Sequence, residues 1–459
     1  MHQELPWQDP LDVFCRVSHL PNIVFFDSAR THDDIGRYSF IAVDPFRTIY
    51  GKNGVFHCDD KKYEGNPFDL LNQVLLEFQS VDHPNLPPFQ GGVAGLFSYE
   101  LNQSLEKLPR AARDDMQFPD LAVGLYDVVI AFEHLQKKLW IVSNGFPEKN
   151  VISRERRAKK RLMWLESLLQ QEYLSKPIAT ITSNQSFLQQ HFSRESYENA
   201  VRYVKEKILD GDIFQANISR RFSAPLPDGL SKIDLYRRLR QLNPASFAAY
   251  FQLGDTTIAS ASPERFISMR DHHIETRPIK GTRPRGVTPE EDKMLIDELK
   301  NSAKDQAENI MIVDLMRNDL SRVAENYSVN VPALCQLESY ATVHHLVSIV
   351  TATCRDNLTT MDVLRATFPG GSVTGAPKIR AMEIIAEVEP VCRGPYCGSL
   401  GYLGFNGAMD TSILIRTFAI KNNIVTFQAG GAVVADSDPR AEFDETTAKA
   451  SALYKTLFG

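Results

Sequence analysis

Short apolar runs separated by polar turns dominate the first 150 residues of the chain. Runs of this length that are rich in β-branched and aromatic residues are typical of strands. The predicted strands are Asn22–Asp27, Tyr38–Val43, the glycine-rich Gly91–Tyr99, and a hairpin formed by Leu121–Phe132 and Lys138–Ser143. Pro67–Phe78 has the apolar spacing of a helix.

A strongly charged helix is predicted at Asn150–Tyr173, and a polar stretch follows it. Residues 175–192 are rich in Ser, Thr and Gln and contain a proline, which is typical of a connection. The chain is therefore divided into an N-terminal region, 1–174, a linker, 175–192, and a C-terminal region, 193–459. This pattern leaves open whether the two regions share one hydrophobic core.

The C-terminal region alternates helical and strand patterns. Ser193 is a plausible N-cap for a helix that ends near Asp210, and Thr288–Glu291 has the pattern of a capping box with proline at the first helical position. Further helices are expected at Asp234–Leu242, Ser302–Met316, Ile379–Glu387 and Pro439–Leu457. Strands are expected at Asp212–Phe222, Ala248–Leu253, Thr257–Ala261, Val343–Thr353, Gly398–Phe405, Met409–Ala419 and Thr426–Val434.

The composition narrows the class of protein. Among 459 residues, 43% are hydrophobic and 24% charged, as in globular proteins of one large or a few ordinary domains. A net charge of −6 argues against a nucleic-acid-binding surface. The chain has no apolar run of bilayer-spanning length, no signal-peptide pattern and no Cys-x-x-Cys pair among its six cysteines. We therefore expect a cytoplasmic protein that binds neither membrane nor nucleic acid.

One lysine lies in an unusually constrained piece of backbone. Lys280 precedes Gly281 and follows Pro278 by two residues. Proline fixes φ and glycine permits conformations that other residues resist, so this lysine is oriented by its backbone. Glu264 also follows a proline, and a turn at Asp271–His273 would close a hairpin between the two segments. Either the acid and the amine share a site with a nucleophilic or basic lysine, or they form a surface ion pair.

Two predicted helices each carry carboxylates on one face. Asp305 and Glu308 are spaced i, i+3, and so are Glu442 and Glu445, with Lys449 one turn further. Carboxylates from two helices could hold Mg²⁺, which binds one or two carboxylates together with water and an anionic substrate. The alternative is a solvated face with a Glu445–Lys449 ion pair, which is common and weak.

Two glycine-rich stretches and one arginine complete the candidate chemistry. Phe368–Lys378 precedes a predicted helix, so its backbone N–H groups could receive a carboxylate. At Gly430 and Gly431 the backbone could approach a ligand closely, although both stretches are also compatible with ordinary turns or bulges. Arg416 lies in the apolar stretch Ile413–Phe418, where a buried guanidinium needs an anion from the protein or from a ligand.

Taken in order, these stretches resemble the chorismate-utilising enzymes. The resemblance covers Ser193 to the C-terminus, and the N-terminal half is similar to the companion region of that family through Gly91–Tyr99. The matching segments are Ser262–Phe266, Lys304–Asp319, His345–Ser348, Gly370–Lys378, Tyr402, Arg416, Gly430-Gly431 and Glu445–Lys449.

The residues at two positions distinguish the members of this family by the reaction that they catalyse. Members that add water to chorismate, and the salicylate synthases, carry a lysine base where this chain has Gln215. Anthranilate synthases carry alanine where this chain has Lys280, and Pro278–Thr282 resembles the branch that aminates chorismate at C4. The resemblance therefore implies synthesis of 4-amino-4-deoxychorismate from chorismate and ammonia, on the route to 4-aminobenzoate and folate. An anthranilate synthase and a catalytically silent chorismate-binding module are the alternatives.

The resemblance also implies a fold and a mechanism. The fold is α/β (α+β), with two β-sheets packed as a sandwich and flanked by helices. Lys280 attacks ring C2 as a covalent nucleophile, with Glu264 as the general acid for the departing C4 hydroxyl. The implied substrate-binding residues are Thr282, His345, Thr374, Tyr402, Arg416, Gly430, Gly431 and Lys449.

The implied cofactor is Mg²⁺, bound to the ring carboxylate of chorismate. Its ligands are Glu308 and Glu445, while Asp305 and Glu442 are expected in the outer shell. Asp305 is shorter than the glutamate of some relatives, which supports that outer role. The chain lacks the Gly-x-Cys-x-Gly turn of a glutaminase, so ammonia is expected from a separate glutamine amidotransferase subunit in a heterodimer, or from solution.

A tryptophan pocket is a further hypothesis. Phe26–Ser28 and Asn243–Phe247 resemble the two segments that bind tryptophan in anthranilate synthases, although Ala245 and Phe247 replace the usual Ser and Tyr. These replacements disfavour feedback control, whereas tryptophan binding without inhibition is compatible with the pattern. The residues of this hypothetical pocket are Ser28, Pro244 and Ser246.

Overall fold

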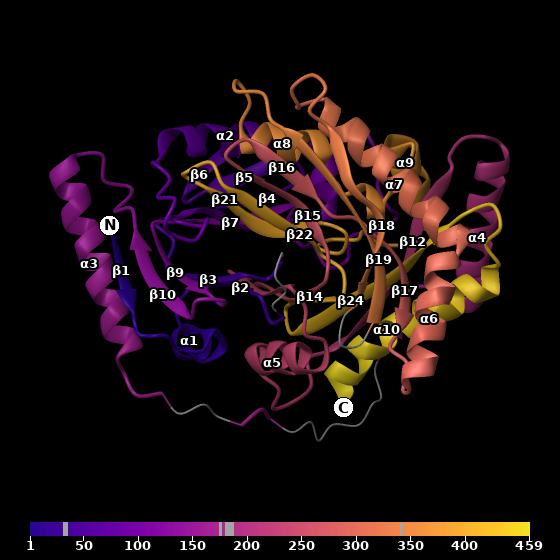
Figure 1. Ribbon diagram of the computed structural model, residues 1–459, viewed down its shortest axis with the longest axis horizontal. Helices are drawn as coiled ribbons and strands as arrows, with labels where there is room; N and C mark the ends of the chain where they lie inside the picture. The colour runs from indigo at the N-terminus through magenta and orange to yellow at the C-terminus, as the bar shows by residue number, and fades with distance from the viewer. Residues whose placement is uncertain (31–34, 174–176, 180–187, 340–342) are drawn as a thin grey trace.

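A computed structural model describes residues 1–30, 35–173, 177–179, 188–339 and 343–459 (Figure 1). Of the predicted linker, 175–192, the parts 175–176 and 180–187 lie outside the described residues. No helix in the described part of the chain is both long and apolar enough to cross a bilayer.

The described residues form two large antiparallel sheets, each of 12 strands. The first, sheet A, has the order β1 (His2–Leu5), β10 (Lys138–Ser143), β9 (Val128–Glu133), β3 (Tyr38–Ala42), β2 (Val24–Asp27), β13 (Phe247–Leu253), β14 (Thr256–Ser262), β23 (Thr417–Lys421), β24 (Ile424–Val433), β12 (Gln215–Pro225) and β11 (Gln189–Gln190), with β20 (Gly375–Ala376) beside β12.

The second, sheet B, has the order β17 (Ile279–Pro284), β19 (Val343–Thr353), β16 (His273–Thr276), β15 (Arg265–Arg270), β22 (Met409–Ile413), β21 (Ser399–Gly404), β7 (Gly92–Phe97), β8 (Leu121–Tyr126), β4 (Arg47–Lys52), β5 (Val55–Cys58) and β6 (Lys61–Glu64), with β18 (Asn330–Ser339) beside β19. In sheet A β2 pairs with β13, and in sheet B β7 pairs with β21. The regions before and after the predicted linker therefore contribute neighbouring strands to both sheets.

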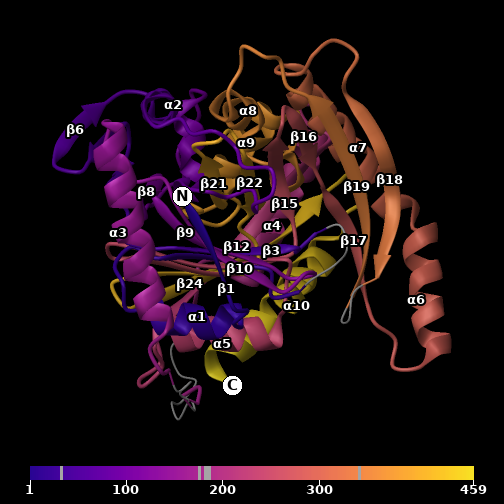
Figure 2. The same cartoon turned by 60° about the vertical axis from the view of Figure 1, so that its left-hand side comes forward.

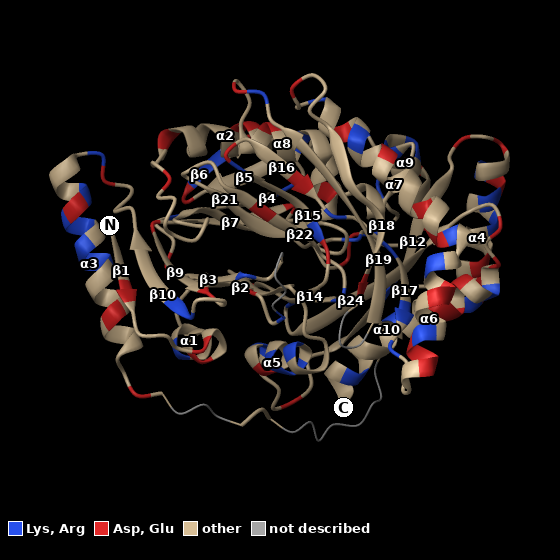
Figure 3. Ribbon diagram, viewed as in Figure 1, with Lys and Arg blue, Asp and Glu red and all other residues tan. Residues whose placement is uncertain are grey.

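Helices cover the outer faces of the two sheets. They are α1 (Pro10–Val17), α2 (Pro67–Glu77), α3 (Val151–Leu169), α4 (Arg194–Leu209), α5 (Lys232–Leu242), α6 (Pro289–Asn301), α7 (Ala303–Ser321), α8 (Thr360–Thr367), α9 (Lys378–Val388) and α10 (Pro439–Phe458), with short 3₁₀ helices η1 (Tyr99–Ser104) and η2 (Gly371–Val373). Figures 1 and 2 place α3 and α6 at opposite ends of the molecule. Charged residues lie along α3, α6 and α10, whereas the strands are mostly uncharged (Figure 3).

Three apolar layers hold this arrangement together. Helices α1, α3, α5 and α10 pack on the outer face of sheet A, and α2, α7 and α8 pack on the outer face of sheet B. Between the sheets lies a third cluster, in which Phe40 and Phe251 of sheet A meet Leu96 and Leu400 of sheet B. The predicted fold, two β-sheets packed as a sandwich and flanked by helices, is confirmed.

Local capping agrees with the sequence. The Ser193 hydroxyl accepts a hydrogen bond from the Ser196 N–H at 3.1 Å, and the Thr288 hydroxyl accepts one from the Glu291 N–H at 3.2 Å. The Glu291 carboxylate, however, accepts from the Val287 N–H, so the predicted capping box at Thr288 is only half formed.

Two long predicted strands are wrong, because each is two strands in different sheets. Leu121–Phe132 divides at Asp127 into β8 of sheet B and β9 of sheet A. Met409–Ala419 divides at Leu414–Arg416 into β22 of sheet B and β23 of sheet A. Sheet residues are buried on both faces here, so the apolar pattern continues through a point where the chain changes sheets.

Candidate active site

Two crossings between the sheets position an acid and an arginine. Glu264 lies between β14 of sheet A and β15 of sheet B, and Arg416 lies between β22 of sheet B and β23 of sheet A, with φ of 51°. The Ala261 N–H donates to the Arg416 carbonyl at 3.1 Å, and the Ile413 N–H donates to the Glu264 carbonyl at 3.2 Å. The two crossings are therefore bonded to the same pair of strands and lie together. Arg416 was predicted inside a strand, and the structure places it in this turn instead.

The lysine predicted as nucleophile lies at an irregularity of β17. The register against β19 shifts between Lys280 and Thr282, so Gly281 is the bulged residue, with φ of 78°. A Cβ at Gly281 would lie 2.9 Å from the Leu299 side chain and 3.1 Å from the Asp305 Cβ. Glycine is therefore required both by the left-handed backbone and by the close approach of α7. The bulge brings Lys280 next to the acidic face of that helix.

Lys280 and Glu264 are electrostatic neighbours in a buried setting. Burial lowers the pKa of Lys280, while the negative charges of Glu308, Glu264 and Glu445 oppose that change. The Glu264 side chain is 3% exposed, and burial raises its pKa to about 7, although Lys280 and Arg416 favour its ionised form. The arrangement brings a lysine that loses its proton more readily to a carboxyl group that can hold one near neutral pH. The hypothesis that this acid and amine share one site agrees with the geometry.

A neutral histidine borders the same group. His345 on β19 is 2% exposed, and its Nδ1 lies 2.8 Å from the Thr282 hydroxyl. Burial and the nearby Arg416 charge lower the pKa of His345 to about 3, so its imidazole is uncharged at neutral pH. His344 instead bonds to Ser339 and Asp292 on its own side of the strand. Of the adjacent pair, His345 is therefore the one whose ring bonds to Thr282 and has Arg416 among its charged neighbours.

The predicted carboxylates converge from α7 and α10. Burial raises the pKa of Glu308, which has Lys280 and Glu445 among its charged neighbours. Burial would also raise the pKa of Glu445, but Lys449, 2.5 Å from its carboxylate, holds that pKa below the ordinary value. The Glu445–Lys449 ion pair expected for a solvated helix face is therefore present, and both side chains are about half exposed. Glu445 nevertheless also has Lys280 among its charged neighbours. Asp305 turns toward Arg283, with 3.2 Å between their charged atoms.

Glu442 and a lysine that sequence reasoning missed complete the acidic group. The Glu442 side chain is buried: one carboxylate oxygen accepts from the Ser437 hydroxyl at 2.7 Å, and the other has no hydrogen-bond partner in the described part of the chain. Lys304 lies 3.9 Å from Glu308 and 3.8 Å from Glu442 and so links the two helices. Its i, i+4 spacing to Glu308 was the available sequence signal.

The carboxylates of α7 and α10 have some of the features of a site for a divalent cation. In residues 1–30, 35–173, 177–179, 188–339 and 343–459, no three Asp, Glu, His or Cys side chains form a metal-ligand set by themselves. Mg²⁺ needs fewer, because it binds through one or two carboxylates and completes its octahedron with water and substrate oxygens. Two acidic helices and a buried carboxylate oxygen of Glu442 without a partner in the described residues fit a cation-binding position, although Lys304 and Lys449 already neutralise part of this acidic charge.

The glycine-rich segments lie at the edge of this group. A Cβ on Gly431 would lie 2.9 Å from a Glu442 carboxylate oxygen, and the Gly430 carbonyl accepts from the Lys449 ammonium at 3.0 Å. The Thr374 side chain is fully buried, and its hydroxyl donates to the Gly370 carbonyl at 3.1 Å. Glycine at these positions therefore lets β24 run directly against the carboxylates of α10.

Two other predicted features lie elsewhere in the fold. Lys378, at the end of the glycine-rich segment, is bound by Asp319 at 2.6 Å, an internal ion pair. Tyr402 lies between the sheets, with its ring centroid 4.4 Å from that of Phe89, and its charged neighbours include Asp410 and Arg265. The structure therefore places Tyr402 in an aromatic cluster rather than among the contacts of Lys280.

The two segments of the hypothetical tryptophan pocket are neighbours. Strand β2 pairs with β13 so that Asp27 lies opposite Ala248, which brings Ser28 close to Ser246. The Ser28 hydroxyl donates to the Tyr38 carbonyl at 2.6 Å, Ser246 is buried, and Pro244 is exposed. The juxtaposition agrees with a pocket that includes these segments, and whether tryptophan binds stays a prediction.

The grouping of this lysine, these glutamates and Arg416 on a double-sheet fold agrees with the resemblance to the chorismate-utilising enzymes. The chain belongs to the family of chorismate binding enzymes, whose pattern matches residues 22–455.

Among named relatives, the chain is 42% identical over 450 residues to aminodeoxychorismate synthase component 1 of Escherichia coli (strain K12), covering 97% of this chain and 95% of that one. It is 39% identical over 453 residues to anthranilate synthase component 1 of Thermus thermophilus, covering 98% and 95%. Among solved structures it is similar to anthranilate synthase component I from Streptococcus pneumoniae, with 32% identity, a TM-score of 0.81, and coverage of 91% and 92%.

Proposed function

We propose that this enzyme aminates chorismate at ring C4 to give 4-amino-4-deoxychorismate, as the names of several relatives suggest. The observation that carries the proposal is the setting of Lys280, which is half-buried and has Glu308 and Glu264 among its charged neighbours. A relative that makes anthranilate needs only an incoming amine at C2. A lysine at this place supplies a covalent amine there and directs the second amine to C4.

The proposed reaction has two displacements. In the first, the neutral Lys280 amine forms a bond to ring C2, the ring double bond shifts, and the C4 hydroxyl leaves as water with the proton of Glu264. In the second, ammonia forms the C4–N bond, the double bond shifts back, and the C2–N bond to Lys280 breaks. Lys280 leaves as an amine, and the proton lost by the incoming ammonia returns to Glu264. Each step uses one acid and one amine that the fold holds together.

The binding residues follow from the same arrangement. Arg416 and Lys449 would neutralise the enolpyruvyl carboxylate, while the uncharged His345 and Thr374 would contact the ring hydroxyl region. Glu308 and Glu445 would hold Mg²⁺, with Glu442 and Asp305 outside them. When bound, the ion would neutralise the ring carboxylate and support loss of the hydroxyl.

A partner is part of the proposal. Relatives are named as component 1 of their enzymes, and the sequence lacks a glutaminase nucleophile turn. We infer that a separate glutamine amidotransferase subunit supplies ammonia to this chain.

The decisive experiment combines product analysis and adduct trapping. Wild type and Lys280→Ala are incubated with chorismate, ammonium and Mg²⁺, and products are identified by ultraviolet spectrum and mass. We expect 4-amino-4-deoxychorismate and a chorismate-derived adduct on the Lys280 peptide of the wild type, and 2-amino products or anthranilate from the variant. Anthranilate from the wild type would favour the second candidate, anthranilate synthase. Normal 4-amino product from Lys280→Ala, without any adduct in the wild type, would refute the nucleophile.

A further inference from the structure

Helix α7 carries a buried asparagine at a position where its spacing predicts an apolar residue. The apolar residues buried along this helix are Ile312, Val313, Met316 and Leu320. Asn309 precedes Ile312 by three residues and Val313 by four, so it lies on the same face, and it is 0% exposed. A leucine would fill this position without burying polar atoms, which are costly to desolvate. Burial alone therefore does not explain the asparagine.

Both ends of the Asn309 amide are hydrogen-bonded to strand β19. The Asn309 nitrogen donates to the Leu346 carbonyl at 3.2 Å, and the Asn309 oxygen accepts from the Ser348 hydroxyl. The Ser348 hydroxyl in turn accepts from the Cys335 N–H at 2.9 Å, on β18. The amide therefore fixes α7 to β19 at two points, and both of its polar atoms have a partner.

The two residues that Asn309 binds also hold the strand of the proposed nucleophile. In the pairing of β17 with β19, Leu346 is the residue opposite Lys280. The Ser348 N–H donates to the Pro278 carbonyl at 3.1 Å, two residues before that lysine. The Asn309 amide is therefore bonded to the part of β19 that sets the register of Lys280.

The carboxylate of Glu308 lies on the helix between two such contacts. Asp305 packs against Gly281 of β17 one turn before Asn309 binds β19, so α7 is held at two successive turns. Glu308 follows Asp305 by three residues, and it is among the charged neighbours of Lys280. A side-chain atom about 5–6 Å from the helix axis moves by about 1 Å for each 10° of rotation. A small rotation of α7 would therefore displace the Glu308 carboxylate from Lys280.

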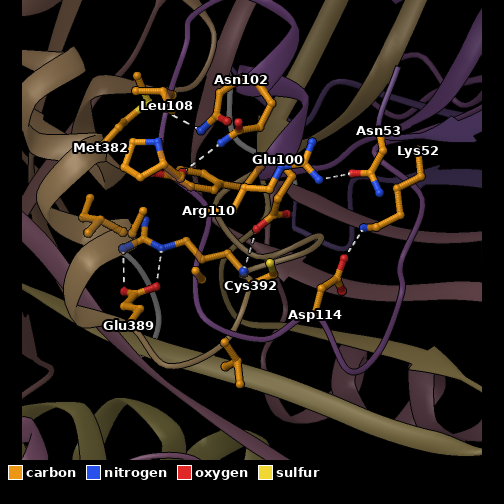
Figure 4. Close-up of a pocket in the computed structure, with 18 residues that line it drawn as sticks. Lys52, Asn53, Glu100, Asn102, Leu108, Arg110, Asp114, Met382, Glu389 and Cys392 are labelled. Atoms are coloured by element: carbon orange, nitrogen blue, oxygen red, sulfur yellow. Dashed lines mark hydrogen bonds and ion pairs between the residues drawn. The ribbon is translucent and has the colours of Figure 1, made fainter. Parts of the chain in front are cut away.

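A second buried asparagine provides a contrast. Asn102 on η1 is 3% exposed and lines a cavity between η1 and α9 (Figure 4). Its amide nitrogen is 3.6 Å from the Met382 sulfur, a weak acceptor, and its side-chain oxygen has no partner in the described part of the chain. None of the residues that line this cavity is a candidate site residue. Burial of an asparagine in this fold therefore does not by itself pair its amide, whereas the place of Asn309 between α7 and β19 does.

We propose that Asn309 is a positioning residue, which fixes the rotation of α7 so that Glu308 keeps its place near Lys280. The role of Lys280 rests on the proposed function, whereas the geometry does not. A buried amide with all of its partners has one favourable orientation, while an apolar side chain packs in several. Loss of the amide should therefore leave a folded protein in which Glu308 is displaced.

The test replaces each of the two asparagines by leucine. Asn309→Leu removes both hydrogen bonds and keeps a side chain of similar size, and Asn102→Leu makes the same change away from Lys280. Crystal structures of wild type and both variants give the distance from the Glu308 carboxylate to the Lys280 ammonium. We expect Asn309→Leu to change this distance by about 1 Å or more, as for about 10° of helix rotation, and Asn102→Leu to leave it unchanged.

Turnover adds a readout that a loss of folded protein alone would not change. With chorismate, ammonium and Mg²⁺, Asn309→Leu should lower kcat by about 10²-fold, as expected for a 1 Å misplacement, and change the KM for chorismate by no more than about twofold. It should also release a larger share of 2-amino products or anthranilate, because Lys280 is less well placed to attack C2. This product ratio does not depend on the amount of folded enzyme. Asn102→Leu should keep the wild-type kcat and product ratio.

Ser348→Ala is the second variant if Asn309→Leu does not fold, because it removes one of the two bonds and leaves the asparagine in place. It should displace Glu308 in the same direction and lower kcat by about tenfold. The proposal is overturned if the folded variant keeps the wild-type Glu308 distance or the wild-type kcat, or if Asn102→Leu changes both as much. Anthranilate from wild type would refute the proposed function instead, and the Glu308 distance and kcat of the variants would still decide the role of Asn309.

Discussion

The raised pKa of Glu264 leads to two predictions for Glu264→Gln. The substitution should stabilise the folded protein relative to wild type at high pH, but it should reduce turnover. Its shift from 4.5 to about 7 corresponds to about 3 kcal/mol in favour of the protonated form in the folded state. Between these two pKa values the folded protein binds more protons than the unfolded chain. Stability contributed by this position therefore falls as the pH rises through that window. Because Glu264 is 3% exposed, solvent screening does not reduce the effect substantially.

Glu264→Gln is the perturbation that isolates this group, because glutamine is neutral at every pH and has nearly the same shape. From the two pKa values, the variant should gain about 2 kcal/mol of unfolding free energy relative to wild type on going from about pH 5.5 to about pH 8.5. Urea unfolding of both proteins at both pH values measures this difference. A wild type and a variant whose stabilities change in parallel with pH would show that Glu264 ionises normally, and the reasoning would be refuted.

The same substitution should damage turnover. If Glu264 is the general acid, wild-type kcat/KM should fall as the pH rises above about 7, because the proton of the free enzyme is then lost. Glu264→Gln should reduce kcat by about 10²- to 10⁴-fold and abolish that pH limb. If Glu264→Gln is stabilised at high pH but keeps the wild-type kcat, the raised pKa of Glu264 is supported and its role as general acid is excluded.

Three further predictions test the cofactor, the partner and the tryptophan hypothesis. Glu308→Gln and Glu445→Gln should each lower kcat by at least about 10²-fold and raise the Mg²⁺ concentration needed, with unchanged circular dichroism; full activity of either in metal-free buffer excludes the assignment. The isolated chain should use ammonium salts but not glutamine, and glutamine-dependent turnover by pure protein would contradict a separate amidotransferase. Equilibrium dialysis should show tryptophan uptake that Ser246→Phe prevents, whereas no uptake by wild type would remove the pocket.

Local structure could be predicted from the sequence because its causes are local. The Ser193 and Thr288 caps, the hairpin turn after β15 and the bounds of α4 and α9 follow from side chains within a few residues of each other. The pairing of Lys280 with the acids of α7 and α10 could not be worked out this way. It depends on a bulge at Gly281 whose fit against Asp305 involves residues 24 positions apart.

The resemblance supplied the residues of the site, but not the reason that they meet. Lys304, which bridges Glu308 and Glu442, was missed because a lysine on an acidic helix is usually solvated. Tyr402 was implied as a substrate-binding residue, and the alternation of β21 directs its ring into the aromatic layer with Phe89. A sequence pattern assigns burial to such a residue without saying which neighbours surround it.

The position of Arg416 depends on the path of the chain between the two sheets, which the apolar pattern of the sequence does not predict. The apolar residues on both sides of it continue without interruption, so the sequence favours one strand. The chain instead leaves sheet B after Ile413 and enters sheet A at Thr417, and a left-handed residue is needed to make that turn.

The acid at the other crossing, Glu264, faces the same corner and is the charge that favours the Arg416 cation. The backbone of each crossing is hydrogen-bonded to a strand that leads into the other crossing. Moving either residue would therefore break backbone hydrogen bonds between the two crossings. If an anionic ring binds here as proposed, the backbone that carries this guanidinium and this carboxyl group would need little reorganisation, which is the condition for electrostatic catalysis.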